Sequence, residues 1–86
     1  AMAKLSILYF AWVREMIGRD EDIVAPPPGA SVADVIALLA ARGGGYAQAM
    51  AQPEKLRAAL DQHFVALDAP IGDARELALF PPVTGG

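Results

Sequence analysis

Apolar and polar residues alternate at the start of the chain, over residues 4–10, with the period of a β-strand. Leu5, Ile7 and Tyr9 would share one buried face. The alternate positions include the polar residues Lys4 and Ser6, which mark the opposite face as the open one. The pattern predicts a strand with one face turned to the core and one face left uncovered.

Two helices are predicted after this strand. Good helix formers fill residues 11–17, and Gly18 suits a C-terminal cap. Ser31 followed by Asp34 resembles a capping box, with Asp in place of the usual Glu or Gln. Apolar residues then recur at helical spacing: Val32, Val35, Ile36 and Leu39.

The predicted long helix ends at residues 43–45, three glycines that we interpret as a C-terminal cap and turn. Arg42 is expected in the last turn, where a cation suits the helix dipole. The remaining elements are less regular. Residues 22–25 and 62–67 are candidate strands, 46–51 a short helical turn, 56–60 an ambiguous segment, and 76–80 the last strand.

This order of elements predicts an α+β fold, with one main helix packed on one face of a small mixed sheet. The β-grasp arrangement of ubiquitin-like proteins fits it. Residues 2–86 would form a single domain, with residues 81–86 as an extended, flexible tail that ends in Gly-Gly. Ala1, which precedes Met2, is interpreted as a cloning remnant.

Composition narrows the possible functions. The 86 residues are 55% hydrophobic with a formal net charge of −3, and no run contains even three Lys or Arg, which argues against nucleic-acid binding. No apolar segment is long enough to span a membrane, and no signal peptide is apparent, so we expect a cytoplasmic protein. Cys is absent, which excludes a thiolate nucleophile or a cysteine zinc site.

The interior of the chain offers no recognisable active site. His63 is the one histidine and has no companions for a metal site, so we interpret it as structural or solvated. The glycines of residues 43–45 lack the Lys of a phosphate loop, and residues 20–22, Asp-Glu-Asp, read as a solvated turn. No metal and no cofactor is expected on this chain.

The C-terminal Gly85-Gly86 is the chemically distinctive feature. A carboxylate is a poor electrophile, but it becomes reactive as an acyl-adenylate. Two residues without side chains could enter a narrow tunnel in another protein. Pro81 and Pro82 would stiffen the segment that leads to them, which lowers the entropic cost of insertion. The alternative is an ordinary frayed terminus.

The chain resembles the small, sulfur-carrying subunit of molybdopterin synthase over nearly its whole length. Residues 8–15 match the family's strand followed by Phe-Ala-x-x-Arg-Glu, the capped helix from Ser31 matches its helix, and residues 80–86, Phe-Pro-Pro-Val-Thr-Gly-Gly, match its most specific stretch. The chain departs from the family at Leu60-Asp61, often Val-Asn, and at residues 73–76, often Asp-Gly-Asp-Glu. Neither departure touches the tail.

The resemblance implies that Gly86 is the reactive residue. A ubiquitin-activating-type enzyme would adenylate its carboxylate with ATP and magnesium, and a sulfur donor would convert it to a thiocarboxylate. That sulfur would attack the cyclic pyranopterin precursor in the large synthase subunit, and two transfers would build the dithiolene. Val83, Thr84 and Gly85 would thread the tunnel. General acids and bases would belong to the large subunit, in an assembly of two small and two large subunits.

A docking surface is predicted from strand parity. Phe10, Phe64 and Phe80, the three phenylalanines of the chain, fall opposite the core side of the sheet. We expect them to bind the large subunit and the adenylating enzyme in turn, together with Pro81 and Pro82. Arg14 would either form a salt bridge at the rim or pair on its own helix. One alternative is that the loop of residues 43–53 covers the phenylalanines. Another is a register slip that reverses the faces of a strand.

Two other functions compete with this one. The same carrier chemistry could serve thiamine synthesis, tRNA thiolation or protein conjugation. The chain could also be a β-grasp binding module whose Gly-Gly end is incidental. Deleting Gly86 separates these cases, because a pure binding module should lose nothing.

Overall fold

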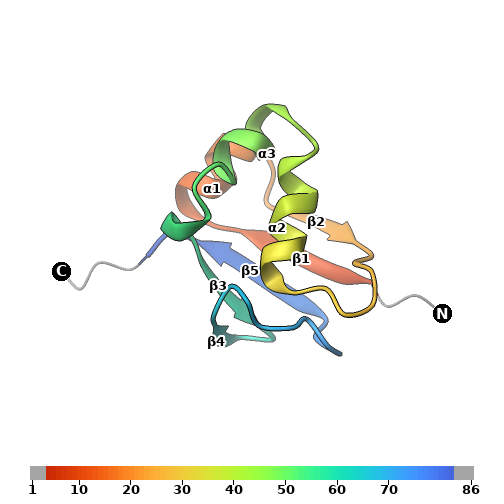
Figure 1. The fold of residues 1–86 in the computed structure, drawn as a ribbon. Coiled ribbons are helices and arrows are strands. Elements are labelled where there is room, and N and C mark those ends of the chain that lie inside the picture. The colour runs from red at the N-terminus through yellow and green to blue at the C-terminus, as the bar shows by residue number, and fades with distance from the viewer. Residues whose placement is uncertain (1–3, 83–86) are drawn as a thin grey trace.

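A five-stranded mixed sheet organises the structure, a computed structural model that describes residues 4–82. The strand order is β2-β1-β5-β3-β4, with β1 and β5 parallel and every other pair antiparallel. This confirms the α+β class (Figure 1). The elements are β1 (Leu5–Tyr9), α1 (Ala11–Ile17), β2 (Glu21–Val24), α2 (Val32–Ala40), α3 (Gly44–Ala49), the 3-10 turn η1 (Pro53–Lys55), β3 (Arg57–Leu60), β4 (His63–Val65) and β5 (Glu76–Phe80).

Both predicted helices form, with the caps that the sequence indicates. Gly18 ends α1 in the left-handed region at φ 84°, and its N–H donates to the Arg14 carbonyl over 2.8 Å. At the start of α2, the Asp34 N–H donates to Ser31 Oγ over 3.1 Å, and the Ser31 N–H donates to Asp34 Oδ2 over 2.9 Å. The capping box is therefore complete, because a side chain of Asp length still reaches back.

The prediction for the end of α2 was wrong in two details. The helix ends at Ala40, so Arg42 lies beyond its last turn. The glycines of residues 43–45 do not cap it, because Ala41 is the capping residue. They start α3 instead, with Gly43 as its N-cap at φ 78°. Gly45 then packs so closely that a Cβ there would lie 2.0 Å from the Met16 carbonyl oxygen of α1.

The second half of the sheet differs from the prediction. The ambiguous segment 56–60 contributes β3, which pairs with β5 on one side and β4 on the other. The strand predicted over residues 62–67 is shorter and ends at Val65. Beyond it the chain turns toward the start of α2, where the Ala33 N–H donates to the Leu67 carbonyl over 2.7 Å. After Val65 the backbone therefore bonds to the start of α2 instead of continuing its pairing with β3.

The core lies between the sheet and the helices that cover one of its faces. In Figure 1, α2 crosses the sheet, α1 lies near the end of β5, and α3 lies against α1. The predicted core positions Leu5, Ile7, Tyr9, Leu77 and Leu79 are each at most 2% exposed. The same holds within a few per cent for the apolar stripe of α2: Val32, Val35, Ile36 and Leu39. None of the helices in the described residues is long and apolar enough to cross a bilayer.

Candidate partner-docking face

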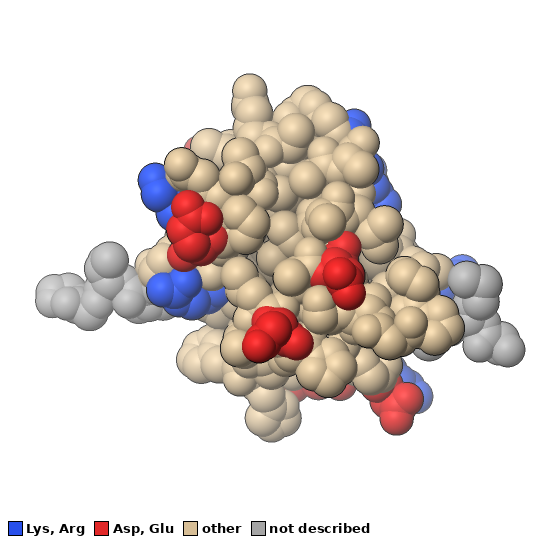
Figure 2. Space-filling model, viewed as in Figure 1, with Lys and Arg blue, Asp and Glu red and all other residues tan. Residues whose placement is uncertain are grey.

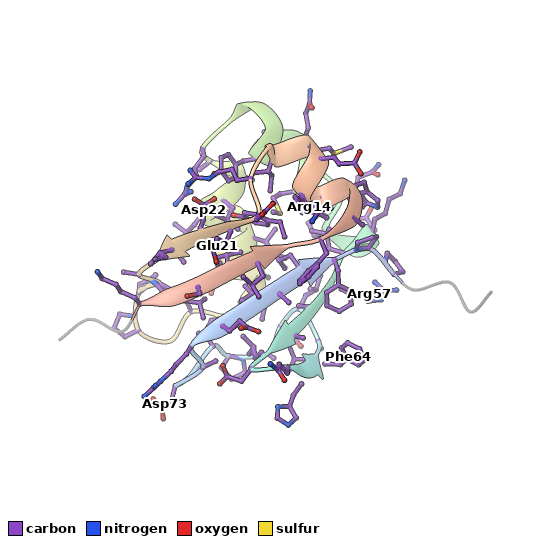
Figure 3. All side chains as sticks on the ribbon, turned by 180° about the vertical axis from the view of Figure 1, so that it is seen from behind. Arg14, Glu21, Asp22, Arg57, Phe64 and Asp73 are labelled. Carbon is purple, nitrogen blue, oxygen red and sulfur yellow. The ribbon has the colours of Figure 1, made fainter. Side chains whose placement is uncertain are left out.

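The face of the sheet turned away from the helices carries a row of apolar side chains. Strand register places Leu8 of β1 beside Ala78 of β5, Ala78 beside Ala59 of β3, and Ala59 beside Phe64 of β4. Figure 3 shows this side of the sheet, with no helix lying over it. The period of two along each strand produces this face, since alternate residues of the same strands fill the core.

The three phenylalanines lie on this open face, as strand parity predicts. Phe64 is 83% exposed and Phe10 is 44% exposed, while Phe80 is half-buried. The Phe64 and Phe80 rings pack with centroids 5.7 Å apart, and the Phe10 N–H donates to the Leu79 carbonyl at the neighbouring end of β5. The alternative, coverage by residues 43–53, is wrong, because α3 packs against α1 and α2 instead. We call Phe10, Phe64 and Phe80 the aromatic patch.

The predicted tail begins beside the aromatic patch. β5 ends at Phe80, and Pro81 and Pro82 follow it without regular secondary structure. Pro82 is exposed and Pro81 is half-buried. The positions predicted to thread the tunnel and to carry the chemistry, Val83, Thr84, Gly85 and Gly86, lie outside the described residues.

Two arginines lie near the aromatic patch. Arg14 is exposed on α1 and, within residues 4–82, pairs with no carboxylate, so the pairing on its own helix that was considered does not form. Arg57 begins β3 directly opposite Phe80. Sequence reasoning missed Arg57, because segment 56–60 was not assigned as a strand. Its spacing of two from Ala59 would have placed it on the open face once β3 was recognised.

A polar cluster on the helix side of the sheet was also not predicted from the sequence. Asp22 of β2, read as part of a solvated turn, is only 8% exposed. Its carboxylate accepts hydrogen bonds from the Tyr9 hydroxyl over 3.0 Å and the Tyr46 hydroxyl over 2.5 Å. The guanidinium groups of Arg19 and Arg42 lie 3.2 and 3.4 Å from it. We call these five residues the Asp22 cluster.

The Asp22 cluster keeps its carboxylate ionised. Burial by itself would raise the pKa of Asp22, but the tyrosine hydrogen bonds and the two nearby guanidinium charges outweigh it, and the pKa lies below its usual value. Burial, with the hydrogen bond to Asp22, raises the pKa of Tyr9. The buried carboxylate thus joins side chains from β1, β2 and the segments around α3, and we interpret the cluster as structural.

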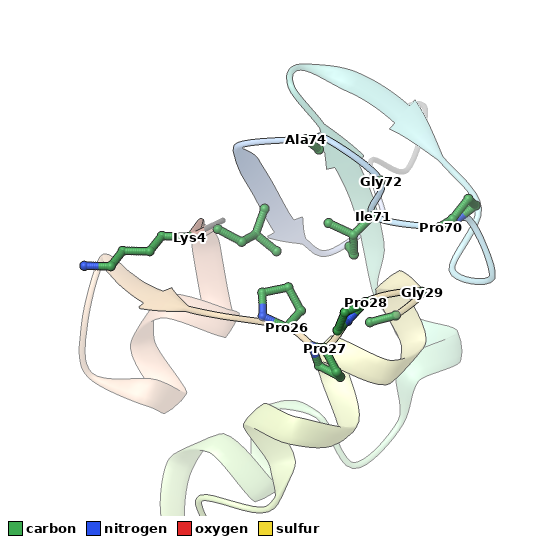
Figure 4. A pocket seen from close by; sticks show the side chains of 11 residues that line it. Lys4, Pro26, Pro27, Pro28, Gly29, Pro70, Ile71, Gly72 and Ala74 are labelled. Carbon is green, nitrogen blue, oxygen red and sulfur yellow. The ribbon is translucent and has the colours of Figure 1, made fainter. Parts of the chain in front are cut away.

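A largely apolar cavity lies at residues other than those of the aromatic patch and the Asp22 cluster. A cavity of about 360 Å³ between residues 26–30 and 70–74 is lined by prolines and aliphatic side chains, and Lys4 is its one charged residue (Figure 4). No group of three potential metal ligands occurs within residues 4–82. His63 is exposed, with Nδ1 3.0 Å from the Asp61 carbonyl oxygen. Acidic side chains on the helix side appear as separate spots rather than one charged patch (Figure 2).

Comparison with known proteins places this geometry in a family. Residues 7–86 match the model of the ThiS family. The chain is 42% identical over 85 residues to the molybdopterin synthase sulfur carrier subunit of Escherichia coli, covering 95% of this chain and 99% of that one. It is 38% identical over 82 residues to the subunit of the same name from Haemophilus influenzae, with the same coverage.

Solved structures agree with the fold. A putative molybdopterin converting factor subunit 1 from Pyrococcus furiosus superimposes with a TM-score of 0.70 at 25% identity, over 94% of this chain and 99% of that one. SAMP1 from Haloferax volcanii superimposes with a TM-score of 0.73 at 25% identity, over 98% of this chain and all of that one. These likenesses support the β-grasp assignment made from the order of elements.

Proposed function

We propose that this chain, which belongs to the ThiS family, is the sulfur carrier subunit of a molybdopterin synthase and that Gly86 carries the sulfur. The observation that carries the proposal is its 42% identity, over 95% of the chain, to a curated subunit of that role. The chain is a sulfur carrier in molybdenum cofactor biosynthesis, and its partner is the large catalytic subunit.

The Gly86 carboxylate is activated in two steps. One carboxylate oxygen attacks the α-phosphorus of ATP, whose charge magnesium neutralises, and pyrophosphate leaves. Hydrosulfide, the form in which the donor delivers the sulfur, then attacks the carbonyl carbon of the acyl-adenylate and AMP leaves, which forms the C–S bond of a thiocarboxylate and releases a proton. A ubiquitin-activating-type enzyme binds the ATP and magnesium, and a separate donor protein supplies the sulfur. The chain itself binds neither cofactor nor metal.

The aromatic patch docks the chain on its partners. Covering a large apolar side chain stabilises a complex by roughly 1.5 to 3 kcal/mol, so an exposed Phe64 and Phe10 provide a strong contact surface. Arg14 adds a charge at the rim. Pro81 and Pro82 hold the chain extended as it leaves β5, which directs Val83, Thr84 and Gly85 into the partner's tunnel.

In the large subunit, the thiocarboxylate sulfur attacks the cyclic pyranopterin precursor. Two such transfers supply the two sulfurs of the dithiolene. In each, water cleaves the acyl C–S bond that joins the chain to the pterin, which leaves the sulfur on the pterin and returns Gly86 to the carboxylate. The assembly contains two small and two large subunits, located in the cytoplasm.

Intact mass spectrometry tests the chemistry. The chain is incubated with ATP, magnesium, an adenylating enzyme and sodium sulfide. Replacement of one oxygen by sulfur should add about 16 mass units to the wild-type chain. A chain without Gly86 should gain nothing while keeping the same thermal midpoint, because the tail lies beyond the last strand. A wild-type chain that stays at its original mass, with an enzyme active on another carrier, would contradict the proposal.

A second role, covalent attachment to lysines of other proteins, is allowed by the same Gly85-Gly86 terminus. The activated Gly86 would then form an isopeptide bond rather than a thiocarboxylate. Mixing the chain, the adenylating enzyme, ATP, magnesium and sodium sulfide with the large synthase subunit and the pterin precursor should give molybdopterin. Lysine conjugates formed without any pterin product would favour the second role.

A further inference from the structure

Arg57 occupies a position on the open face that the carrier chemistry does not explain. It begins β3 and lies opposite Phe80, the last residue of β5 before the tail. In Figure 3 it lies on the same side of the sheet as Phe64. The residue is exposed, so its charge is available to a partner.

The guanidinium of Arg57 is held in place by the backbone beside it. Its Nη1 donates to the Leu56 carbonyl over 2.9 Å and to the Glu54 carbonyl of η1 over 3.2 Å. These bonds use one nitrogen and leave other N–H groups free to donate. A positioned arginine loses less side-chain entropy on binding than a free one, which is the usual advantage of a preorganised contact.

Arg57 has no acidic partner within residues 4–82, where both ion pairs formed by arginine involve Asp22. It borders a cleft of about 250 Å³ whose other walls are the aromatic pair Phe64 and Phe80, with Ala58 and Val65. The cleft is smaller than the usual small-molecule site and suits a single side chain. An arginine beside two aromatic rings has the composition of an interaction hot spot.

We infer that Arg57 is a specificity-determining residue for the large subunit, which places an aliphatic side chain between Phe64 and Phe80 and an adjacent carboxylate on the free N–H groups of Arg57. The inference rests on the proposed function, since it assumes that the aromatic patch docks that subunit. Charge complementarity selects the occupant. Arg57 has no carboxylate partner within residues 4–82 and borders an apolar cleft, so it fits a partner segment in which an acidic residue stands next to an apolar one.

Binding of the cognate large subunit to the full-length chain tests this inference, measured by calorimetry or surface plasmon resonance. Arg57→Gln should raise Kd about tenfold, and Arg57→Glu about a hundredfold because it adds repulsion. Arg75→Gln is the matched control, because Arg75 is also exposed but precedes β5 at its other end. It should change Kd less than about twofold.

Salt separates charge from packing. Raising NaCl from about 0.05 M to about 0.5 M should narrow the difference in Kd between wild type and Arg57→Gln, because salt screens an ion pair at the rim of the interface. Equal Kd values for Arg57→Gln and Arg75→Gln would overturn the inference. A loss of affinity in Arg57→Gln that is the same at both salt concentrations would also overturn it. If Arg57→Gln fails to fold, Arg57→Met replaces it, because it keeps an unbranched apolar stem without the charge, and its Kd should likewise rise about tenfold. A Kd equal to that of Arg75→Gln would again overturn the inference.

The controls distinguish failure of this inference from failure of the proposed function. If wild type binds the large subunit and Phe80→Ala weakens binding, the docking face is correct, and an unchanged Arg57→Gln rejects only the role of Arg57. If wild type neither binds nor accepts sulfur, the carrier role itself is wrong.

Discussion

The two faces of the sheet come from the same strands but have opposite tasks. On the helix side, Leu77 and Leu79 of β5 are fully buried, whereas Ala78 and Phe80 between and after them reach the open side. Phe64, on the same open side, is 83% exposed. A period of two therefore separates stability from binding within a single strand. A variant on one face should affect folding, and a variant on the other should affect association.

The largest expected difference is between two neighbouring residues of β5. Leu79→Ala should lower the free energy of unfolding by about 3 kcal/mol, because it removes a fully buried side chain and leaves a cavity. Phe80→Ala should lower the free energy of unfolding by about 1 kcal/mol or less, since the Phe80 ring is half-exposed. Urea denaturation of both variants measures the difference. Equal losses would show that the faces are not functionally separate.

The Asp22 cluster allows a test of how polar contacts on the helix side of the sheet contribute to stability. Asp22→Asn should lower the free energy of unfolding by about 2 kcal/mol near neutral pH, because charge-assisted bonds to two tyrosines and two arginines are lost. Thermal denaturation should show a midpoint lower by roughly 8 to 16 °C.

The same cluster sets a pH dependence. The pKa of Asp22 is lower in the folded chain than in the unfolded one, so its stabilising contribution is complete above the unfolded value of about 3.9. That contribution is lost as pH falls through the lower folded pKa. The stability gap between wild type and Asp22→Asn should therefore close on acidification. A gap that stays constant down to the acid limit would contradict this account of Asp22.

Close backbone packing of α3 on α1 gives a smaller test. Gly45→Ala should lower the free energy of unfolding by about 1.5 kcal/mol, because its Cβ would collide with the Met16 carbonyl oxygen. The gain in helix propensity offsets part of the strain, by roughly 1 kcal/mol. Chemical denaturation measures the net effect. A stabilised Gly45→Ala variant would show that α3 can shift freely on α1.

The smallest expected change in stability lies on the open face. Phe64→Ala should alter the free energy of unfolding by less than about 0.5 kcal/mol, because the side chain is largely solvated. Its Kd for the large subunit should nevertheless rise about tenfold, as for a central aromatic contact. Calorimetric binding beside a thermal melt gives both quantities. Loss of stability without loss of affinity would reverse the assignment of this face.

Local signals in the sequence determined much of the fold. Ser31 and Asp34 start α2 through contacts three residues apart, and Gly18 ends α1 through a left-handed turn. The alternation in residues 76–80 predicts β5 with its observed bounds. These elements were predictable because their causes lie within one turn or one strand of chain. The family, and with it the carrier role, was recognisable from the motif that includes Arg14 and from the final stretch of the chain.

The tertiary structure decided what depended on distant partners. Arg57–Leu60 becomes β3 only because β5 and β4 pair with it, since its own Ala-rich pattern has no clear period. Asp22 is buried because Tyr46, 24 residues later, reaches its carboxylate. The exposure of Phe64 followed from parity, but its packing on Phe80 beside Arg57 required the register of three strands. Short-range propensity cannot report such contacts, because their energy arises only when segments far apart in sequence meet.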